Sequence, residues 1–379
     1  MSYPVEEHAN YLADSVRIRA YRRALSMRVC PGDVVVDLGS GTGVLGLLAC
    51  AAGASRVYCI DAGPMLDVAR EHVEQSPYRE RFTFFQRHSE EIDLPERADL
   101  VVADQMGAIG LWAGLLPCFA DARRRFLKPG GGLLPGTLRI QFSAVEESTF
   151  PRQLEAIASN VGDLGLARFR HLLVNDFREV GGRDARQLTD PGTFKTLQLG
   201  VDEPDLLTGS FDLEVTSAGA ANGLLGWFSA GLAAEIDLTN CPFGAESIGR
   251  EGLFLPFGDR AELEPGDTLR VSLSIASRDA FCAWHVQRID ASGHRTTITK
   301  RTSLASRLLN RGSLGQGHAQ HRPLLNPMGE LKRFVLELCD ANNTVESIID
   351  AVYKRYPEHV RSPRRAEELV LTTLRNLTQ

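Results

Sequence analysis

The chain lacks the sequence features that mark membrane and secreted proteins. No stretch approaches the roughly 20 apolar residues that a membrane-spanning helix needs. Residues 1–14 contain no apolar run, so we expect no secretory signal there. The 7 cysteines include no CxxC pair, which argues against a zinc site and against a disulfide framework. These absences together predict a protein of the reducing cytoplasm with no membrane partner.

Dense runs of lysine and arginine are also missing. The chain has 42 basic and 48 acidic residues, for a mild net charge of -6. Because proteins that bind nucleic acid usually carry a basic patch or stripe, nucleic acid is not expected as the main partner. A length of 379 residues is sufficient for two or three domains.

The most informative segment is an apolar strand that leads directly into a glycine-rich turn. The strand is predicted over 34–38, and an apolar helix follows over 44–52. The turn between them has glycine at alternate positions: Gly39, Gly41 and Gly43. Glycines let the backbone turn sharply and let a ligand lie against it. A second strand, 56–60, ends at Asp61, at the spacing where a carboxylate takes both hydroxyls of a ribose. The unit predicts a nucleoside cofactor site.

The glycine spacing and the acid before it distinguish between cofactors. A dinucleotide site usually spaces its glycines as GxGxxG, so that the pyrophosphate meets a helix N-terminus. Here the spacing is GxGxG, and Asp37 precedes it. An acid at that point repels a phosphate but accepts hydrogen bonds from an ammonium group. The amino-acid end of S-adenosylmethionine carries an ammonium and no phosphate, so the sequence predicts this methyl donor rather than NAD.

The pattern along the chain predicts several domains. Residues 1–30 have apolar positions at helical spacing and are expected to form a helical cap. Strands and helices alternate over 31–137, which predicts a Rossmann-like methyltransferase sheet, with residues 127–132 ending a helix before another strand. Short alternating stretches over 138–305 predict an antiparallel β-barrel or sandwich. A less strand-like segment near 156–177 interrupts it as a helical excursion or dimer arm.

A third unit follows a polar linker. The linker, 306–320, is rich in Gly, Ser and His. Apolar positions over 321–379 predict three short helices, the second opened by Thr344 as N-cap. The predicted fold class is therefore an α/β Rossmann-like sheet, an antiparallel β-barrel or sandwich, and a small C-terminal helical domain.

Several motifs resemble, in the same order, those of the protein arginine methyltransferases, over roughly residues 5–305. The matching segments are 8–21, 37–43, 89–95 and 99–107. They are similar to the family's helical cap over the cofactor, its glycine motif, its adenine-binding stretch, and the loop with its first active-site acid. The resemblance implies a class I S-adenosylmethionine-dependent methyltransferase. It also implies a homodimer, because the family places its dimer arm where 156–177 interrupts the barrel.

The resemblance also implies which residues bind the cofactor. The expected set is His8, Arg17, Asp37, Gly39, Gly41, Gly43, Asp61 and Glu90. Arg17 would pair with the carboxylate of the methyl donor, and His8 would lie near that carboxylate. Gly39 would approach the sulfonium side, Asp61 would bind the ribose, and Glu90 would accept a hydrogen bond from the adenine amino group. From the residues alone, two other readings stay open: Arg17 pairs with Asp14, and Glu90 is a solvated loop acid.

The active-site segment departs from the family. Its members normally hold two glutamates that pin a guanidinium, a group otherwise always protonated and a poor nucleophile. Here the first acid is Asp104, the usual tryptophan after it is Gln105, and the second acid is Ala113. The family's Thr-His-Trp loop reads Ser247-Ile248-Gly249. We expect Asp104 and Gln105 to be the catalytic residues.

These departures leave three hypotheses for the activity. A carboxylate is charged at neutral pH and needs no base, so carboxylate O-methylation on a peptide is the first expectation. Asp104 would oppose an anion if it faced the substrate. Arginine N-methylation, with Asp104 and Glu246 replacing the missing pair, is the second. A protein that binds a peptide without chemistry is the third.

The last unit resembles the PqqD-like peptide-chaperone domains. The similar segments are 322–327, 336–349 and 353–357. Such domains capture the leader of a ribosomally made peptide so that an enzyme can modify its core. The strands that usually pair with the leader are not evident here. The resemblance implies a precursor peptide as partner, docked through 321–379, and a role in natural-product maturation. The alternative is a helical tail that stabilises the barrel or a dimer.

Overall fold

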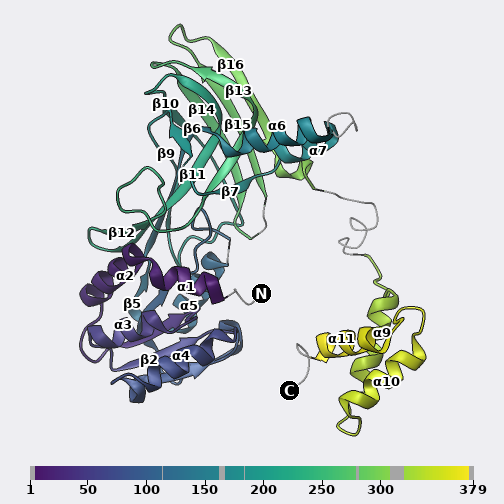
Figure 1. Ribbon diagram of the computed structural model, residues 1–379. Coiled ribbons are helices and arrows are strands. Elements are labelled where there is room, and N and C mark those ends of the chain that lie inside the picture. Colours follow the sequence, from purple (N-terminus) through teal and green to yellow (C-terminus); the bar gives the residue numbers. More distant parts are fainter. Residues whose placement is uncertain are drawn as a thin grey trace. The chain divides into compact units, whose positions relative to one another are not determined.

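The chain forms two compact units, 1–307 and 308–379, each described here by itself (Figure 1). The computed structural model describes residues 5–112, 114–161, 167–182, 184–278, 281–307 and 320–374. Ala113 and most of the expected linker lie outside the described residues.

The first unit contains a five-stranded parallel sheet in the order β3-β2-β1-β4-β5. Its strands are β1 (Val34–Leu38), β2 (Arg56–Ile60), β3 (Phe82–Phe85), β4 (Ala98–Ala103) and β5 (Leu127–Leu134). Its helices are α3 (Val44–Ala52), α4 (Met65–Glu74) and α5 (Leu115–Arg125). The predicted Rossmann-like sheet is confirmed. The strand order reverses between β1 and β4, which is where such sheets bind ligands.

One local expectation is corrected in this sheet. Residues 127–132, expected to end a helix before a strand, already belong to β5. The pairing of β4 with β5 shifts register between Ala98 and Leu100, and this irregularity accommodates the proline and glycines.

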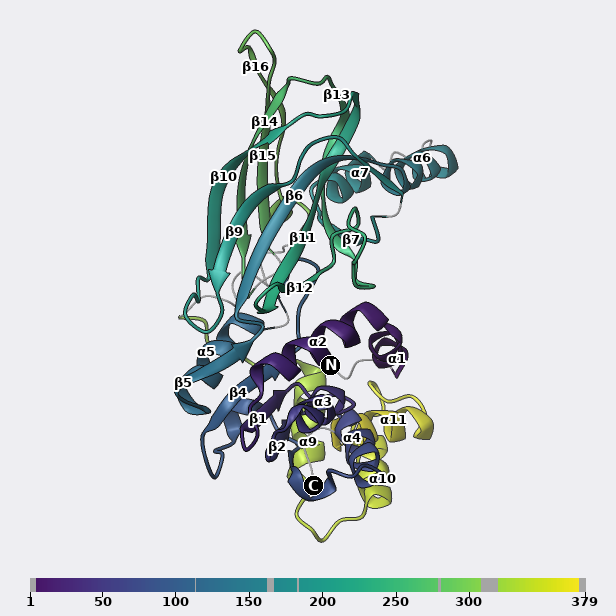
Figure 2. The same cartoon turned by 90° about the vertical axis from the view of Figure 1, so that its left-hand side faces the viewer.

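Two helices cover the carboxyl edge of the sheet. They are α1 (Val5–Ala13) and α2 (Ser15–Arg28), separated by Asp14, whose carboxylate caps α2 by accepting from the Arg17 backbone N–H at 3.1 Å. No residue of α1 is buried, whereas α2 buries Tyr21, Ala24 and Leu25. In both views α2 lies between the parallel sheet and the strands β11 and β12 (Figures 1 and 2).

The rest of the unit is antiparallel, as predicted. One sheet has the order β10-β14-β15-β16 and the other β7-β13-β11-β6-β8, with β12 on β11 and β9 on β6. The strands are β6 (Thr137–Glu147), β7 (Arg178–Val180), β8 (Ala185–Gln187), β9 (Gly192–Gln198), β10 (Leu206–Glu214), β11 (Gly219–Ala233), β12 (Ile236–Thr239), β13 (Gly252–Leu263), β14 (Thr268–Ala276), β15 (Cys282–Ile289) and β16 (Arg295–Thr302). One continuous apolar core joins these sheets to the parallel one.

A helical pair interrupts the barrel-like part and lies on its outside (Figure 2). It consists of α6 (Thr149–Val161) and α7 (Ala167–Val174), so it begins before the expected residue 156. The early start has a local cause. The carboxylate of Glu147 accepts from the backbone N–H groups of Thr149 at 2.7 Å and Phe150 at 2.8 Å, which satisfies donors of the first turn.

The second unit has three helices around a core of its own. They are α9 (Pro327–Glu337), α10 (Val345–Arg355) and α11 (Pro363–Leu374). The core consists of the buried residues Leu331, Val335, Ile348, Val352, Val360, Ala366 and Val370. Thr344 caps α10 by accepting from the Ser347 N–H at 3.2 Å. Residues 320–374 contain no strand. Across all described residues, no helix combines the length and apolar character required to span a bilayer.

Candidate active site

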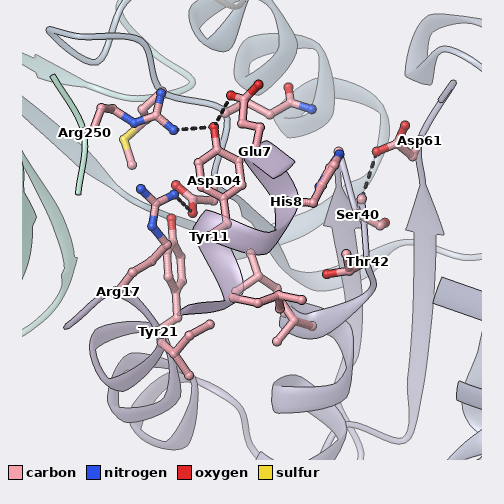
Figure 3. A pocket seen from close by; sticks show the side chains of 18 of the residues that line it. Glu7, His8, Tyr11, Arg17, Tyr21, Ser40, Thr42, Asp61, Asp104 and Arg250 are labelled. Carbon is pink, nitrogen blue, oxygen red and sulfur yellow. Dashed lines mark hydrogen bonds and ion pairs between the residues drawn. The ribbon is translucent and has the colours of Figure 1, made fainter. Parts of the chain in front are cut away.

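A cavity of about 460 Å³ lies where β1, β2 and β4 end, beneath α1 (Figure 3). This volume falls within the roughly 300–1,000 Å³ typical of small-molecule sites. Its charged and polar lining comes from both halves of the unit and includes Glu7, His8, Tyr11, Arg17, Tyr21, Ser40, Thr42, Asp61, Asp104, Gln105, Glu179 and Arg250.

The glycine turn is shaped by close neighbours. Gly39 has a φ of 71°, and a Cβ there would lie 1.7 Å from the Nε2 atom of Gln105. Gly41 has a φ of 49°, and its Cβ would lie 2.9 Å from a ring carbon of His8. Both positions therefore exclude a side chain on grounds of backbone angle and of space. The turn leaves bare backbone facing the cavity.

Asp61 fixes this turn from the end of β2. One carboxylate oxygen accepts from the Gly41 N–H at 2.8 Å and the other from the Gly63 N–H at 2.7 Å. Each oxygen keeps a second lone-pair site, so the side chain still has the capacity to accept from two hydroxyls of a ligand. The side chain lines the cavity.

Asp37 lies below the turn and is fully buried, outside the cavity lining. One oxygen accepts from the Gly46 N–H at 2.8 Å, and the other has no hydrogen-bond partner. Burial raises the pKa of this carboxyl to about 7, with smaller contributions from the charges of Asp61 and Asp104. The structure therefore places Asp37 one layer away from the surface that a ligand touches.

Arg17 and Asp104 form an ion pair in the cavity wall, and Arg17 is 2% exposed. The Nη1–Oδ2 distance is 2.6 Å. The pairing with Asp14, the other reading from the sequence, is longer at 3.6 Å. Two atoms of this pair are buried without hydrogen-bond partners: Arg17 Nε and Asp104 Oδ1. Since buried polar atoms are nearly always paired, these two atoms have hydrogen-bonding capacity that the described residues do not use.

A second polar group links the cap to the barrel. The Tyr11 hydroxyl donates to Glu7 at 2.8 Å and accepts from Arg250 at 2.7 Å (Figure 3). Burial raises the pKa of Tyr11 to about 12, so the hydroxyl stays protonated. The Gly249 N–H adds a bond of 2.8 Å to Asp14. The cap is thus tied to the loop before β13.

The lining residues that sequence reasoning missed include Glu7, Tyr11, Glu179 and Arg250. A signal existed for some of them. Glu7 and Tyr11 lie one helical turn apart beside His8, and Arg250 directly follows the altered 247–249 segment. Nothing local marks Glu179, which reaches the site because β7 pairs with β13.

Three expected residues do not line the cavity: Asp37, Gly43 and Glu90. Gly43 is the N-cap of α3. Glu90 is exposed on a short helical turn held by Arg125, which donates to the backbone oxygens of Ser89 and Ile92, each at 2.7 Å. Glu246, weighed as a replacement acid, is also exposed and outside the lining.

Comparisons with known proteins agree with this geometry. Residues 35–131 match a family described as a methyltransferase domain. Protein arginine N-methyltransferase 6 of Xenopus tropicalis is 26% identical over 289 residues, which cover 73% of this chain and 85% of that protein. Protein arginine N-methyltransferase 1 of Dictyostelium discoideum is 30% identical over 172 residues, or 45% of this chain and 50% of that protein.

Solved structures share the fold at low identity. Arabidopsis thaliana protein arginine methyltransferase 10 superposes with a TM-score of 0.67 at 20% identity, covering 79% of this chain and 97% of that one. The Trypanosoma brucei PRMT1 enzyme–prozyme heterotetrameric complex with AdoHcy superposes with a TM-score of 0.67 at 20% identity, covering 78% of this chain and 97% of that one.

The chain is therefore a class I S-adenosylmethionine-dependent methyltransferase that is similar to the protein arginine methyltransferases. The lining fits that cofactor. The bare turn at Gly39 and Gly41 and the carboxylate of Asp61 suit a nucleoside. The unpartnered Nε of Arg17 suits a carboxylate.

Proposed function

We propose that this enzyme methylates a guanidinium nitrogen of an arginine in a peptide. The observation that carries the proposal is Asp104, a residue of the cavity lining whose oxygen Oδ1 is buried and has no hydrogen-bond partner among the described residues. A guanidinium presents several N–H donors in a fixed fork, which is the complement of such an acceptor.

The charge of the lining supports a cationic substrate. Four carboxylates face the cavity against two guanidiniums: Glu7, Asp61, Asp104 and Glu179 against Arg17 and Arg250. Glu7 and Glu179 supply acid groups that the sequence lacks at position 113. Partial burial, then the charges of Glu251 and Glu7, raise the pKa of Glu179, and Arg250 opposes them. Glu179 thus holds a proton more readily than a fully solvated glutamate does.

The residues have distinct tasks in this chemistry. Bound S-adenosylmethionine supplies an electrophilic methyl group. Asp104 orients the guanidinium, and Arg17 holds Asp104 in place through their ion pair. A nitrogen that gains a methyl group must lose a proton, and a nearby carboxylate that accepts a hydrogen bond from its N–H group eases that loss. Trp112, stacked on Phe177 with ring centroids 5.1 Å apart, supplies an aromatic side chain to the cavity lining.

Carboxylate O-methylation is the second candidate. The observation in its favour is that the other oxygen of Asp104 is neutralised by Arg17, while position 113 carries no acid. A carboxylate substrate would then lie near Arg250. Alkali treatment distinguishes the two products, because a methyl ester is cleaved by mild base and a methylguanidine is stable.

The peptide partner and the assembly are further parts of the proposal. We infer that residues 321–379 dock a ribosomally made precursor peptide, and that α6 and α7 join two copies of the chain. Exposed apolar side chains on the helical unit support a docking role: Leu336, Val345, Tyr353 and Leu371. A cytoplasmic location is proposed with them, since all 7 cysteines are free thiols.

The test is methyl transfer to defined peptides by the full-length protein. Peptides containing arginine, lysine and glutamate are incubated with the enzyme and the donor, and the modified residue is located by tandem mass spectrometry. Label on arginine supports the proposal, label on a carboxyl group supports the second candidate, and no transfer to any peptide supports a binding protein. Light scattering of the same sample tests the dimer, and a monomer would exclude it.

A further inference from the structure

Arg250 stands out among the lining residues because the reaction leaves it without a task. It lies in the loop before β13, directly after the altered segment 247–249, and donates one hydrogen bond to the Tyr11 hydroxyl. Its Nε atom is buried and has no hydrogen-bond partner. Among the described residues no carboxylate lies within 4.0 Å of its guanidinium.

Arg17 provides the contrast within the same cavity. Its guanidinium is neutralised by Asp104 at 2.6 Å. The nearby carboxylate of Glu179 interacts electrostatically with Arg250, which opposes the rise in the pKa of Glu179, yet the two side chains form no ion pair within 4.0 Å. An arginine kept at a cavity wall with an unsatisfied buried N–H and an unpaired charge is poised for an anionic ligand.

The side chain is also held in place before any ligand arrives. The Tyr11 hydroxyl accepts from its Nη2 at 2.7 Å, and the Tyr11 ring lies 5.3 Å from its Cζ. Glu7 in turn accepts from Tyr11 at 2.8 Å, which fixes the orientation of the phenol. A guanidinium fixed in this way loses little conformational freedom when it binds a carboxylate.

The position of Arg250 separates it from the nucleoside end of the cofactor site. Figure 3 shows Arg250 beyond the hydroxyl of Tyr11, on the opposite side of the view from Ser40, Thr42 and Asp61. Arg17, whose Cζ is 4.4 Å from the same ring, also differs from it in having a counter-ion. The geometry points to the substrate rather than the donor as the source of the anion.

We propose that Arg250 binds a carboxylate of the substrate that adjoins the methylated residue. This inference rests on the proposed function: Asp104 receives the guanidinium and Arg250 receives the carboxylate of a neighbouring aspartate or glutamate, or of the peptide C-terminus. Asp104 and Arg250 line one cavity, and each has a buried atom without a hydrogen-bond partner, an acceptor on Asp104 and a donor on Arg250, which matches a substrate that carries both charges. The enzyme therefore selects arginine in an acidic context.

The test uses synthetic peptides that vary the flanks of one arginine. Aspartate, glycine or lysine is placed on either side of the arginine in C-terminally amidated peptides, and one further peptide ends in arginine with a free carboxylate. For the wild type we expect kcat/KM to be about tenfold higher with aspartate flanks than with glycine flanks, the scale of a hydrogen bond between charged groups. A gain confined to the free C-terminus identifies that source of the carboxylate.

Variants separate a substrate role from a cofactor role. Arg250→Gln should reduce the aspartate-to-glycine ratio to about 1, mainly through KM, while the affinity for S-adenosylhomocysteine measured by calorimetry stays within about twofold. Arg22→Gln, an exposed arginine of α2, is the matched control and should keep the ratio.

Two results overturn the inference. One is a wild type that methylates arginine regardless of flank or terminus. The other is an Arg250→Gln variant that keeps the ratio but loses affinity for S-adenosylhomocysteine, since Arg250 would then hold the donor. Methylation that never reaches arginine in any peptide refutes the proposed function instead, and is distinguishable from both.

Discussion

Replacing Asp104 with asparagine should destabilise the first unit as well as remove activity. The substitution deletes the charge that Arg17 contacts at 2.6 Å and leaves this 2% exposed guanidinium with Asp14 at 3.6 Å. Removing a partner from a hydrogen bond to a charged group costs about 1.5–3 kcal/mol, and breaking a fully buried pair costs about 3–5 kcal/mol. Because Asp104 is 15% exposed, water replaces part of the interaction. We expect a loss of about 2 kcal/mol.

Urea unfolding followed by tryptophan fluorescence measures this loss. Trp112, Trp227 and Trp284 are the 3 tryptophans of the chain, and all belong to the unit 1–307, so the signal reports that unit alone. A double-mutant cycle of Asp104→Asn with Arg17→Met should give a coupling energy of about 1–2 kcal/mol. Asp93→Asn, a fully exposed partner of Arg125 at 3.9 Å, is the control and should leave the unfolding free energy unchanged. Additive effects of the two substitutions would refute the pair as a structural link between the cap and the acid loop.

Three further predictions concern the cofactor site and the second unit. Asp61→Ala should weaken S-adenosylhomocysteine binding by about tenfold or more, because it removes the carboxylate that accepts from the glycine turn and from the ligand, whereas a change at the exposed Asp67 to alanine should not. Equal affinities of the two variants in calorimetry would exclude a role of Asp61 in cofactor binding. The pKa of Asp37 is raised to about 7 in the folded state, so this carboxyl loses its proton at lower pH in the unfolded chain, and the free energy of unfolding of the wild type should fall as pH rises from about 4 to 7. The Asp37→Asn variant should lack this part of the decline, and parallel pH profiles of the two proteins would contradict the raised pKa. Removing residues 308–379 should leave donor binding intact and raise KM for a full-length precursor peptide by about tenfold or more, whereas unchanged kinetics would refute the docking role.

The regular parts of the fold were predictable because their signals are local. The β1 strand is fully buried and reads as an apolar run, and the glycines after it are required by backbone angles and close neighbours. The same holds for the N-cap of α10, since Thr344 acts within three residues of its own position.

The site was predictable only in part, because its decisive contacts join distant segments. Arg17 meets Asp104 across 87 positions and Arg250 meets Tyr11 across 239. No periodicity encodes such contacts, which depend on how the cap, the sheet and the barrel pack. The substitution of the Thr-His-Trp loop indicated a changed pocket, but not that Arg250 would bond with the cap.

Identifying the residue that receives the methyl group tests the proposed arginine methylation most directly. The full-length enzyme is given a donor with a deuterated methyl group and a peptide that contains both arginine and carboxylates, and the product is sequenced by tandem mass spectrometry before and after mild alkali. We expect label on the arginine side chain that survives alkali and is absent with Asp104→Asn. Label that alkali removes, with the arginine unmodified, would contradict it.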